Sequence, residues 1–225
     1  MLRRGYAYVT GRPVVMGARH MIATSHYLAS AAGYSMLDRG GSAADALIAA
    51  NAVLCVVYNH MAGLGGDMFA QAWSPGSGTV TALNGSGRSG ERVDAELYRS
   101  RGWDEIHARG PLAANTVPGV VHAWSELHRK FGKLGWEALF GPAVGYARNG
   151  FPVSQKFSDY VAQYSGTIRR FESAARIYLP GGNAPPAGSV LKQEDLASSL
   201  ETIASEGPQS FYTGSLGRKI IEGLR

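Results

Sequence analysis

Residues 42–74, SAADALIAANAVLCVVYNHMAGLGGDMFAQAWS, decide the fold. Ser42 is a residue type favoured at helix N-caps, and Asp45 three positions later gives a pattern close to a capping box. Residues 43–57 are apolar almost all round, which predicts a helix buried between other layers. The GLGG sequence that follows indicates a tight turn or a close approach of the backbone, and residues 68–73 then predict a strand. The stretch therefore predicts a buried helix that leads through a turn into a sheet.

The segments on either side extend this pattern. Mixed small and β-branched residues over 14–25 predict a strand, and Ser25 is the expected cap of a helix that ends at Gly40-Gly41. Downstream, residues 75–78 predict a turn and residues 79–83 a returning strand. The two strands around this turn should form a β-hairpin with a loop of four to five residues.

Helical patterns dominate the rest of the chain, over residues 119–131, 136–149, 155–165 and 194–206. Residues 180–188 are rich in proline and glycine and resemble a linker. The order is a strand, two helices, a hairpin and then many helices. This order predicts an α+β fold in which helices pack on a mixed or antiparallel sheet.

Charge and composition exclude several classes of partner. The 225 residues carry a formal net charge of +5, but the basic residues are scattered, so we expect no nucleic-acid partner. Residues 43–57 are too short for a membrane span, and residues 1–12 are too short and polar for a signal peptide. A cytoplasmic protein is therefore expected. Cys55 is the single cysteine and has apolar neighbours, which predicts a buried structural thiol.

No familiar catalytic or cofactor motif is present. The GLGGD sequence at 63–67 is not a phosphate-binding loop, because it lacks the P-loop lysine and leads into a strand instead of opening a helix. The sequence contains neither an HExxH zinc motif nor a GxSxG nucleophile elbow, and we expect neither a metal nor a cofactor. From residue chemistry alone, the polar, glycine-rich loop at residues 84–90 is the part able to line a site.

A series of segments resembles, in the same order, those of gamma-glutamyltransferases, also called glutathione hydrolases. The matching segments are residues 23–30, 40–46, 63–69, 117–121, 142–153, 195–200 and 211–214. The resemblance extends from about Gly17 to Arg225 and covers only the front part of the family's large subunit.

This resemblance implies an N-terminal nucleophile hydrolase fold, a four-layer αββα sandwich, which would be incomplete in this chain. Members are made as inactive precursors that cut themselves before a threonine, whose α-amino group then activates its hydroxyl. That threonine attacks an amide carbonyl, and the acyl group passes to water or an amine. The resemblance places the threonine beyond Arg225, so no catalytic residue is expected in this chain, which alone should be inactive. The implied partners are the missing small-subunit segment and a small amide or gamma-glutamyl substrate.

Two positions depart from the family pattern. The family's arginine that clamps the substrate α-carboxylate aligns with Ser86, and Arg88 follows two positions later. Asp67 stands where the best-known members have glycine. These departures indicate the acylase branch of the family, and the expected substrate-binding residues are Arg88, Ser86 and Asn84.

Three interpretations follow from these departures. Arg88 replaces the clamp through a shift in the loop, or the acyl group is not glutamyl and resembles, for example, a cephalosporin side chain. The ungapped alignment favours the second of these. The third is a non-catalytic remnant that keeps the fold as an interaction module. A threonine-led small subunit encoded downstream of Arg225 would argue against the remnant.

Overall fold

Helices and two antiparallel strand pairs make up the residues that the computed structural model describes, 14–106, 113 and 115–224. The signal-peptide prediction for residues 1–12 lies outside them. The elements in chain order are α1 (Tyr27–Asp38), α2 (Ala43–Val57), β1 (Met68–Ser74), β2 (Thr79–Gly85), α3 (Ala95–Arg99), α4 (Val120–Phe131), η1 (Trp136–Leu139), α5 (Gly141–Asn149), β3 (Phe151–Pro152), α6 (Gln155–Gln163), α7 (Ser165–Ile168), α8 (Glu172–Tyr178), η2 (Pro180–Gly182), β4 (Val190–Leu191), α9 (Glu194–Glu206), α10 (Gln209–Tyr212) and α11 (Ser215–Gly223).

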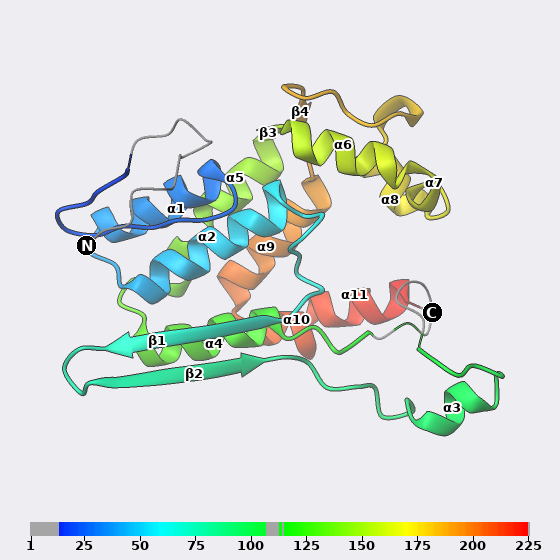
Figure 1. Ribbon diagram of the computed structural model, residues 1–225, viewed down its shortest axis with the longest axis horizontal. Helices are drawn as coiled ribbons and strands as arrows, with labels where there is room; N and C mark the ends of the chain where they lie inside the picture. The colour runs from blue at the N-terminus through cyan, green and yellow to red at the C-terminus, as the bar shows by residue number, and fades with distance from the viewer. Residues whose placement is uncertain (1–13, 107–112, 114, 225) are drawn as a thin grey trace, which may run out of the picture.

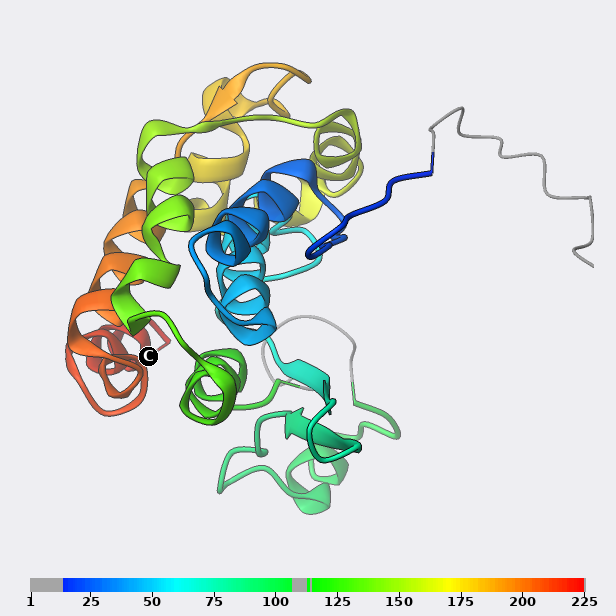
Figure 2. The same cartoon turned by 90° about the vertical axis from the view of Figure 1, so that its left-hand side faces the viewer.

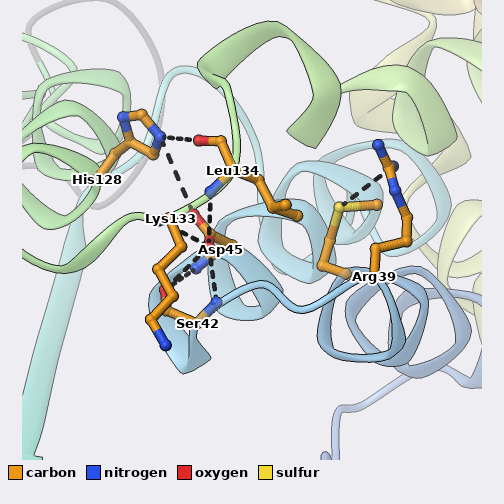
Figure 3. Close-up of polar contacts among 7 residues, drawn as sticks. Arg39, Ser42, Asp45, His128, Lys133 and Leu134 are labelled. Carbon is orange, nitrogen blue, oxygen red and sulfur yellow. Dashed lines mark hydrogen bonds and ion pairs between the residues drawn. The ribbon is translucent and has the colours of Figure 1, made fainter.

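The predicted capping box at the start of α2 is confirmed. The Ser42 hydroxyl accepts the Asp45 amide at 3.1 Å, and the Asp45 carboxylate accepts the Ser42 amide at 2.7 Å. The same carboxylate oxygen also accepts the backbone N–H groups of Lys133 at 3.0 Å and Leu134 at 3.2 Å (Figure 3). Asp45 is fully buried. It therefore ties the first turn of α2 to the segment that follows α4.

Helix α2 forms the centre of the core, as its apolar sequence predicts. Eleven of its fifteen residues are buried, and α1, α4 and α5 pack around it. Figures 1 and 2 show α1, α2, α5 and α9 stacked as one group of helices, with the hairpin and α4 along one side of it. None of the helices in the described part of the chain is both long and apolar enough to cross a membrane.

The predicted hairpin is also confirmed. Strands β1 and β2 pair antiparallel from Met68 opposite Gly85 to Ser74 opposite Thr79, which leaves the four-residue turn 75–78 between them. Strand β2 runs two residues further than the sequence indicates, so Asn84 and Gly85 belong to the strand and not to the loop. Helix α4 packs against both strands. The hairpin is therefore held at the side of the helical core.

The region before α1 corrects the sequence interpretation. Residues 14–25 form no strand, and within the described residues nothing pairs with them. Alternating residues can form a strand only where a partner offers hydrogen bonds. The N-cap of α1 is His26 and not Ser25, because the ring Nδ1 of His26 accepts the amide of Leu28 at 3.3 Å. The helix ends as predicted, with Gly40 at a φ of 85°.

The later helices follow the predictions with two differences. Helices α4 and α9 agree with the predicted ranges, but the single helix expected over 136–149 is divided at Phe140 into η1 and α5. Pro142 lies in the first turn of α5, where its missing N–H and fixed φ are tolerated, so it favours a new helix start there. The helix expected over 155–165 ends at Gln163, and the short helix α7 begins at Ser165.

Candidate functional site

A pocket of about 420 Å³ opens where the chain leaves β2. Three segments that are distant in sequence meet there: the end of β2 with the loop after it, the residues that lead into α4, and α10. The residues lining the pocket are Asn84, Gly85, Ser86, Gly87, Arg88, Val117, Pro118, Gly119, His122, Gln209 and Tyr212. The three residues expected to bind substrate therefore lie in a single pocket.

Local hydrogen bonds shape the loop that carries these three residues. The Asn84 side-chain oxygen accepts the Ser86 amide at 3.0 Å, a turn that leads the chain out of the strand. The Arg88 carbonyl accepts the amide of Val117 at 2.9 Å, so the backbone at Arg88 is held while its side chain is exposed. Among the described residues that line the pocket, Arg88 carries the only permanent charge. It forms no ion pair within the described part of the chain, so the guanidinium is available to an anionic group.

Glycines allow the end of β2 and its loop to cross the segment before α4 at contact distance. A side chain at Gly87 would collide with the carbonyl oxygen of Val117, and one at Gly119 would collide with that of Gly85. A Cβ on Gly85 itself would lie 2.6 Å from the Met68 carbonyl oxygen. Because a real Cβ atom cannot approach backbone atoms so closely, these positions require glycine. One wall of the pocket is therefore built largely from backbone.

Asp67 joins the GLGGD turn to the pocket loop. Its carboxylate accepts the Gly87 amide at 3.0 Å and the Thr116 hydroxyl at 3.3 and 3.4 Å, with the Ser86 hydroxyl further away at 3.5 Å. The preceding residue contributes as well, since the Gly66 carbonyl accepts the amides of Gly119 and Val120, both at 3.0 Å. Residues 66–67 thus contact the two segments that form the pocket wall. The glycine run was expected to form a tight turn or a close backbone approach, and the tight turn is confirmed by the Gly66 amide, which donates to the Gly63 carbonyl at 3.0 Å.

Sequence reasoning missed His122, Gln209 and Tyr212 as lining residues. The Tyr212 hydroxyl donates to the Pro118 carbonyl at 2.9 Å and accepts the amide of His122 at 2.9 Å. Burial raises the pKa of Tyr212 above its ordinary value, and the bond from the His122 amide opposes that shift. Tyr212 lies within a segment that carries the family resemblance, but nothing in its local sequence places it next to α4.

The remaining candidate groups are structural. Cys55 is buried, as predicted, and burial raises the pKa of its thiol to about 12, which leaves it without a reactive thiolate at neutral pH. In the described ranges, no three His, Cys, Asp or Glu side chains are grouped so that they could hold a metal ion. Among the described residues, the polar side chains that line the pocket are those of Asn84, Ser86, Arg88, His122, Gln209 and Tyr212.

Comparison with known proteins identifies the family. Residues 29–225 match the sequence family described as Gamma-glutamyltranspeptidase. The glutathione hydrolase-like YwrD proenzyme of Bacillus subtilis is 40% identical over 211 residues, covering 94% of this chain and 40% of that protein. The oxamate amidohydrolase proenzyme of Klebsiella pneumoniae is 37% identical over 211 residues, covering 91% of this chain and 39% of that protein. The chain thus spans about two fifths of the length of these relatives.

Solved structures give the same result. The cephalosporin acylase from Bacillus halodurans superposes with a TM-score of 0.88 at 32% identity, covering 97% of this chain and 41% of that one. The gamma-glutamyltranspeptidase of Helicobacter pylori superposes with a TM-score of 0.87 at 25% identity, covering 94% of this chain and 61% of that one. The neighbours have the N-terminal nucleophile hydrolase fold, so the expected α+β fold class is confirmed, and this chain forms part of that fold.

Proposed function

Since the chain belongs to the gamma-glutamyltranspeptidase family, we propose that it is the front part of the large subunit of a self-cleaving amidohydrolase or acyltransferase. The proposed nucleophile is a threonine in the part of the protein that follows Arg225, freed by cleavage of an inactive precursor. Two of the relatives carry the word proenzyme in their names, which supports this processing. The residues described here would then bind the acyl group and leave bond cleavage to the partner segment.

The substrate that the pocket suits best is an amide whose acyl group carries a carboxylate. The observation that carries this is the single guanidinium, Arg88, in a pocket otherwise lined by neutral groups and His122. An arginine can hold a carboxylate through two parallel hydrogen bonds, and Ser86 and Asn84 add neutral polar groups beside it. Glutathione and oxamate, the compounds in the names of two relatives, both carry carboxylate groups.

A neutral acyl group is the second candidate. The sequence feature in its favour is Ser86, which occupies the aligned position of the family's clamp. In that case Arg88 would lie at the rim of the pocket and contribute little to catalysis. The same set of variants separates the two candidates.

The test uses the complete, processed protein with Arg88→Ala and Arg88→Lys, assayed on two amides that differ only in the acyl carboxylate. The Arg88 side chain is exposed in the described residues, and we propose that the rest of the protein covers it when substrate is bound. Loss of one partner of the buried charge pair would then cost about 2–5 kcal/mol, which predicts a roughly 30- to several-thousand-fold fall in kcat/KM on the carboxylate substrate. Lysine keeps the charge without the planar fork, so Arg88→Lys should recover part of that loss. The neutral substrate should be affected far less.

Arg176→Ala is a matched control, because Arg176 is an exposed arginine whose partner is the exposed Asp195 on α9. An equal loss on both substrates with Arg88→Ala would assign Arg88 a structural role. Faster turnover of the neutral amide by the wild-type protein would favour the second candidate. A complete protein that is not cleaved and shows no amidase activity would favour the non-catalytic remnant.

Residues 1–225 would form one partial domain, with 180–188 as a connection within it. The packing of α9 against α5 supports this, since these helices lie on opposite sides of that stretch in the sequence. The chain alone should release no chromophore from gamma-glutamyl-p-nitroanilide. A cytoplasmic location stays a prediction, which fractionation of the source cells would test.

A further inference from the structure

We propose that Asp67 is a positioning residue that fixes the loop of residues 86–88 and thereby sets where Arg88 meets the acyl group. This inference rests on the proposed substrate-binding role of Arg88. Asp67 does not itself line the pocket, so its effect on substrate would be transmitted through the loop.

Asp67 contacts donors from two separate segments. Its carboxylate receives the Gly87 amide at 3.0 Å from the loop and the Thr116 hydroxyl at 3.3 Å from the segment before α4. One carboxylate group thus joins both sides of the pocket wall. Each oxygen of a carboxylate accepts hydrogen bonds and neither donates, which suits a position where all the contacting groups are donors.

The loop itself has few other attachments. Gly87 has no side chain with which to pack, and its neighbour Ser86 is exposed. Residues 84–85 are held by their pairing with β1, and the following loop is held, within the described residues, by the bonds to Asp67, the Asn84 turn, the bond from the Val117 amide to the Arg88 carbonyl and the close crossing of Gly87 with Val117. We expect removal of the bonds to Asp67 to loosen the loop at Gly87. The bond from the Gly87 amide is charge-assisted, and such bonds are roughly twice as strong as neutral ones.

The charge of Asp67 is met by neutral donors. Within the described residues Asp67 forms no ion pair, and its contacts are an amide and two hydroxyl groups. A surface aspartate that only adds solubility would not need three donors from two segments. The arrangement instead favours a structural role for the Asp67 carboxylate, which would hold the loop and so fix the position of Arg88.

The variants are Asp67→Ala, which removes the acceptor, and Asp67→Asn, which keeps one acceptor oxygen without the charge. Thr116→Val removes one hydroxyl donor to the Asp67 carboxylate. Asp104→Ala is the matched control, because Asp104 is an exposed aspartate in the loop after α3. All are made in the complete, processed protein. The first readout is hydrogen–deuterium exchange of the peptide that covers residues 84–90, because the Gly87 amide is itself the donor.

Asp67→Ala should raise exchange in that peptide and leave α2 unchanged, whereas Asp67→Asn should give an intermediate value and Asp104→Ala none. Unchanged exchange with Asp67→Ala would overturn the proposal. This measurement needs no substrate, so it stands even if the complete protein has no amidase activity. Failure of the proposed function and failure of the positioning role are therefore distinguishable.

The second readout is kinetic. Asp67→Ala should lower kcat/KM on the carboxylate substrate by about 10- to 100-fold, mainly through KM, because a misplaced Arg88 weakens binding in ground and transition states alike. In an Arg88→Ala background the same change should add little, since the two residues act as one unit. Fully additive losses would show that Asp67 does not act through Arg88 and would overturn the proposal.

Discussion

Replacing Asp45 with alanine in the complete protein removes the acceptor that ties α2 to the segment after α4. One oxygen of Asp45 accepts the amides of Ser42, Lys133 and Leu134 and the Ser42 hydroxyl. The other oxygen is buried without a hydrogen bond and lies 3.9 Å from the His128 Nε2. Alanine would leave three backbone N–H groups without their acceptor and would also remove the unpartnered oxygen.

These contacts set the expected magnitude. Loss of the capping interaction costs about 1 kcal/mol. Each of the two amides from the segment after α4 adds about 1–1.5 kcal/mol, because a partly buried donor loses a charged acceptor. Removal of the unpartnered oxygen offsets a part of this sum. We expect a net loss of about 3 kcal/mol, which lowers Tm by roughly 2–3 °C if a complete protein of about 530 residues unfolds as one unit.

The assay is thermal unfolding of three variants beside the wild type. Asp45→Asn keeps an acceptor oxygen for the same donors and loses only the charge, so it should recover at least half of the loss. Asp38→Ala is the control, since Asp38 is an exposed aspartate whose ion pair with Arg19 is solvent-screened and contributes little. A decrease in Tm of less than about 1 °C for Asp45→Ala, or an equal decrease for Asp45→Asn, would refute this account of the bridge.

Three further outcomes are expected from the structure. The Cys55 thiol, whose pKa is raised to about 12 by burial, should resist alkylation at pH 8 until the protein is unfolded; rapid labelling of the native protein would contradict its burial. Burial, with the positive charges of Lys156 and His26, lowers the pKa of His60. The unfolded state therefore binds a proton at higher pH than the folded state does, and the stability should fall as pH decreases below about 6.5. His60→Phe keeps the ring contacts and should make the loss of stability at low pH smaller in melting curves. Some loss should remain, because burial also lowers the pKa of His26. Gly87→Ala should displace the pocket loop and lower activity on every substrate, and unchanged activity would show that the crossing tolerates a side chain.

Elements with local signals were predictable from the sequence. The capping box at Ser42, the glycine end of α1 and the hairpin around residues 75–78 depend on contacts between near neighbours in sequence. The strand predicted over residues 14–25 is wrong because a strand depends on a partner that their own pattern does not specify. The sequence did not predict the division at Phe140, because residues on both sides of it favour helix. Pro142 is compatible with a helix start, but its position alone does not indicate that a new helix begins there.

The pocket was predictable on one side only. The glycine-rich stretch at the end of a strand was expected to line a site, and Asn84, Ser86 and Arg88 do line the pocket, but their substrate-binding role stays a prediction. Tyr212 and Gln209 reach the same pocket through long-range packing of α10 against the segment before α4. Asp67 was noticed as a departure from the family pattern, but its partners lie in two distant segments that no local pattern connects.

The Tyr212 hydroxyl, which bridges the Pro118 carbonyl and the His122 amide, limits how the chain can be dissected. A variant shortened to end before Gln209 would keep the hairpin, α4 and Arg88, yet it would lack one side of the cavity and the cap on the His122 amide. Replacing residues 84–88 with those of a relative would raise the same problem, because the new segment would pack beside the α10 of this protein and not beside its own. If this pocket binds the acyl group as proposed, experiments that exchange segments between relatives should move the loop and α10 together.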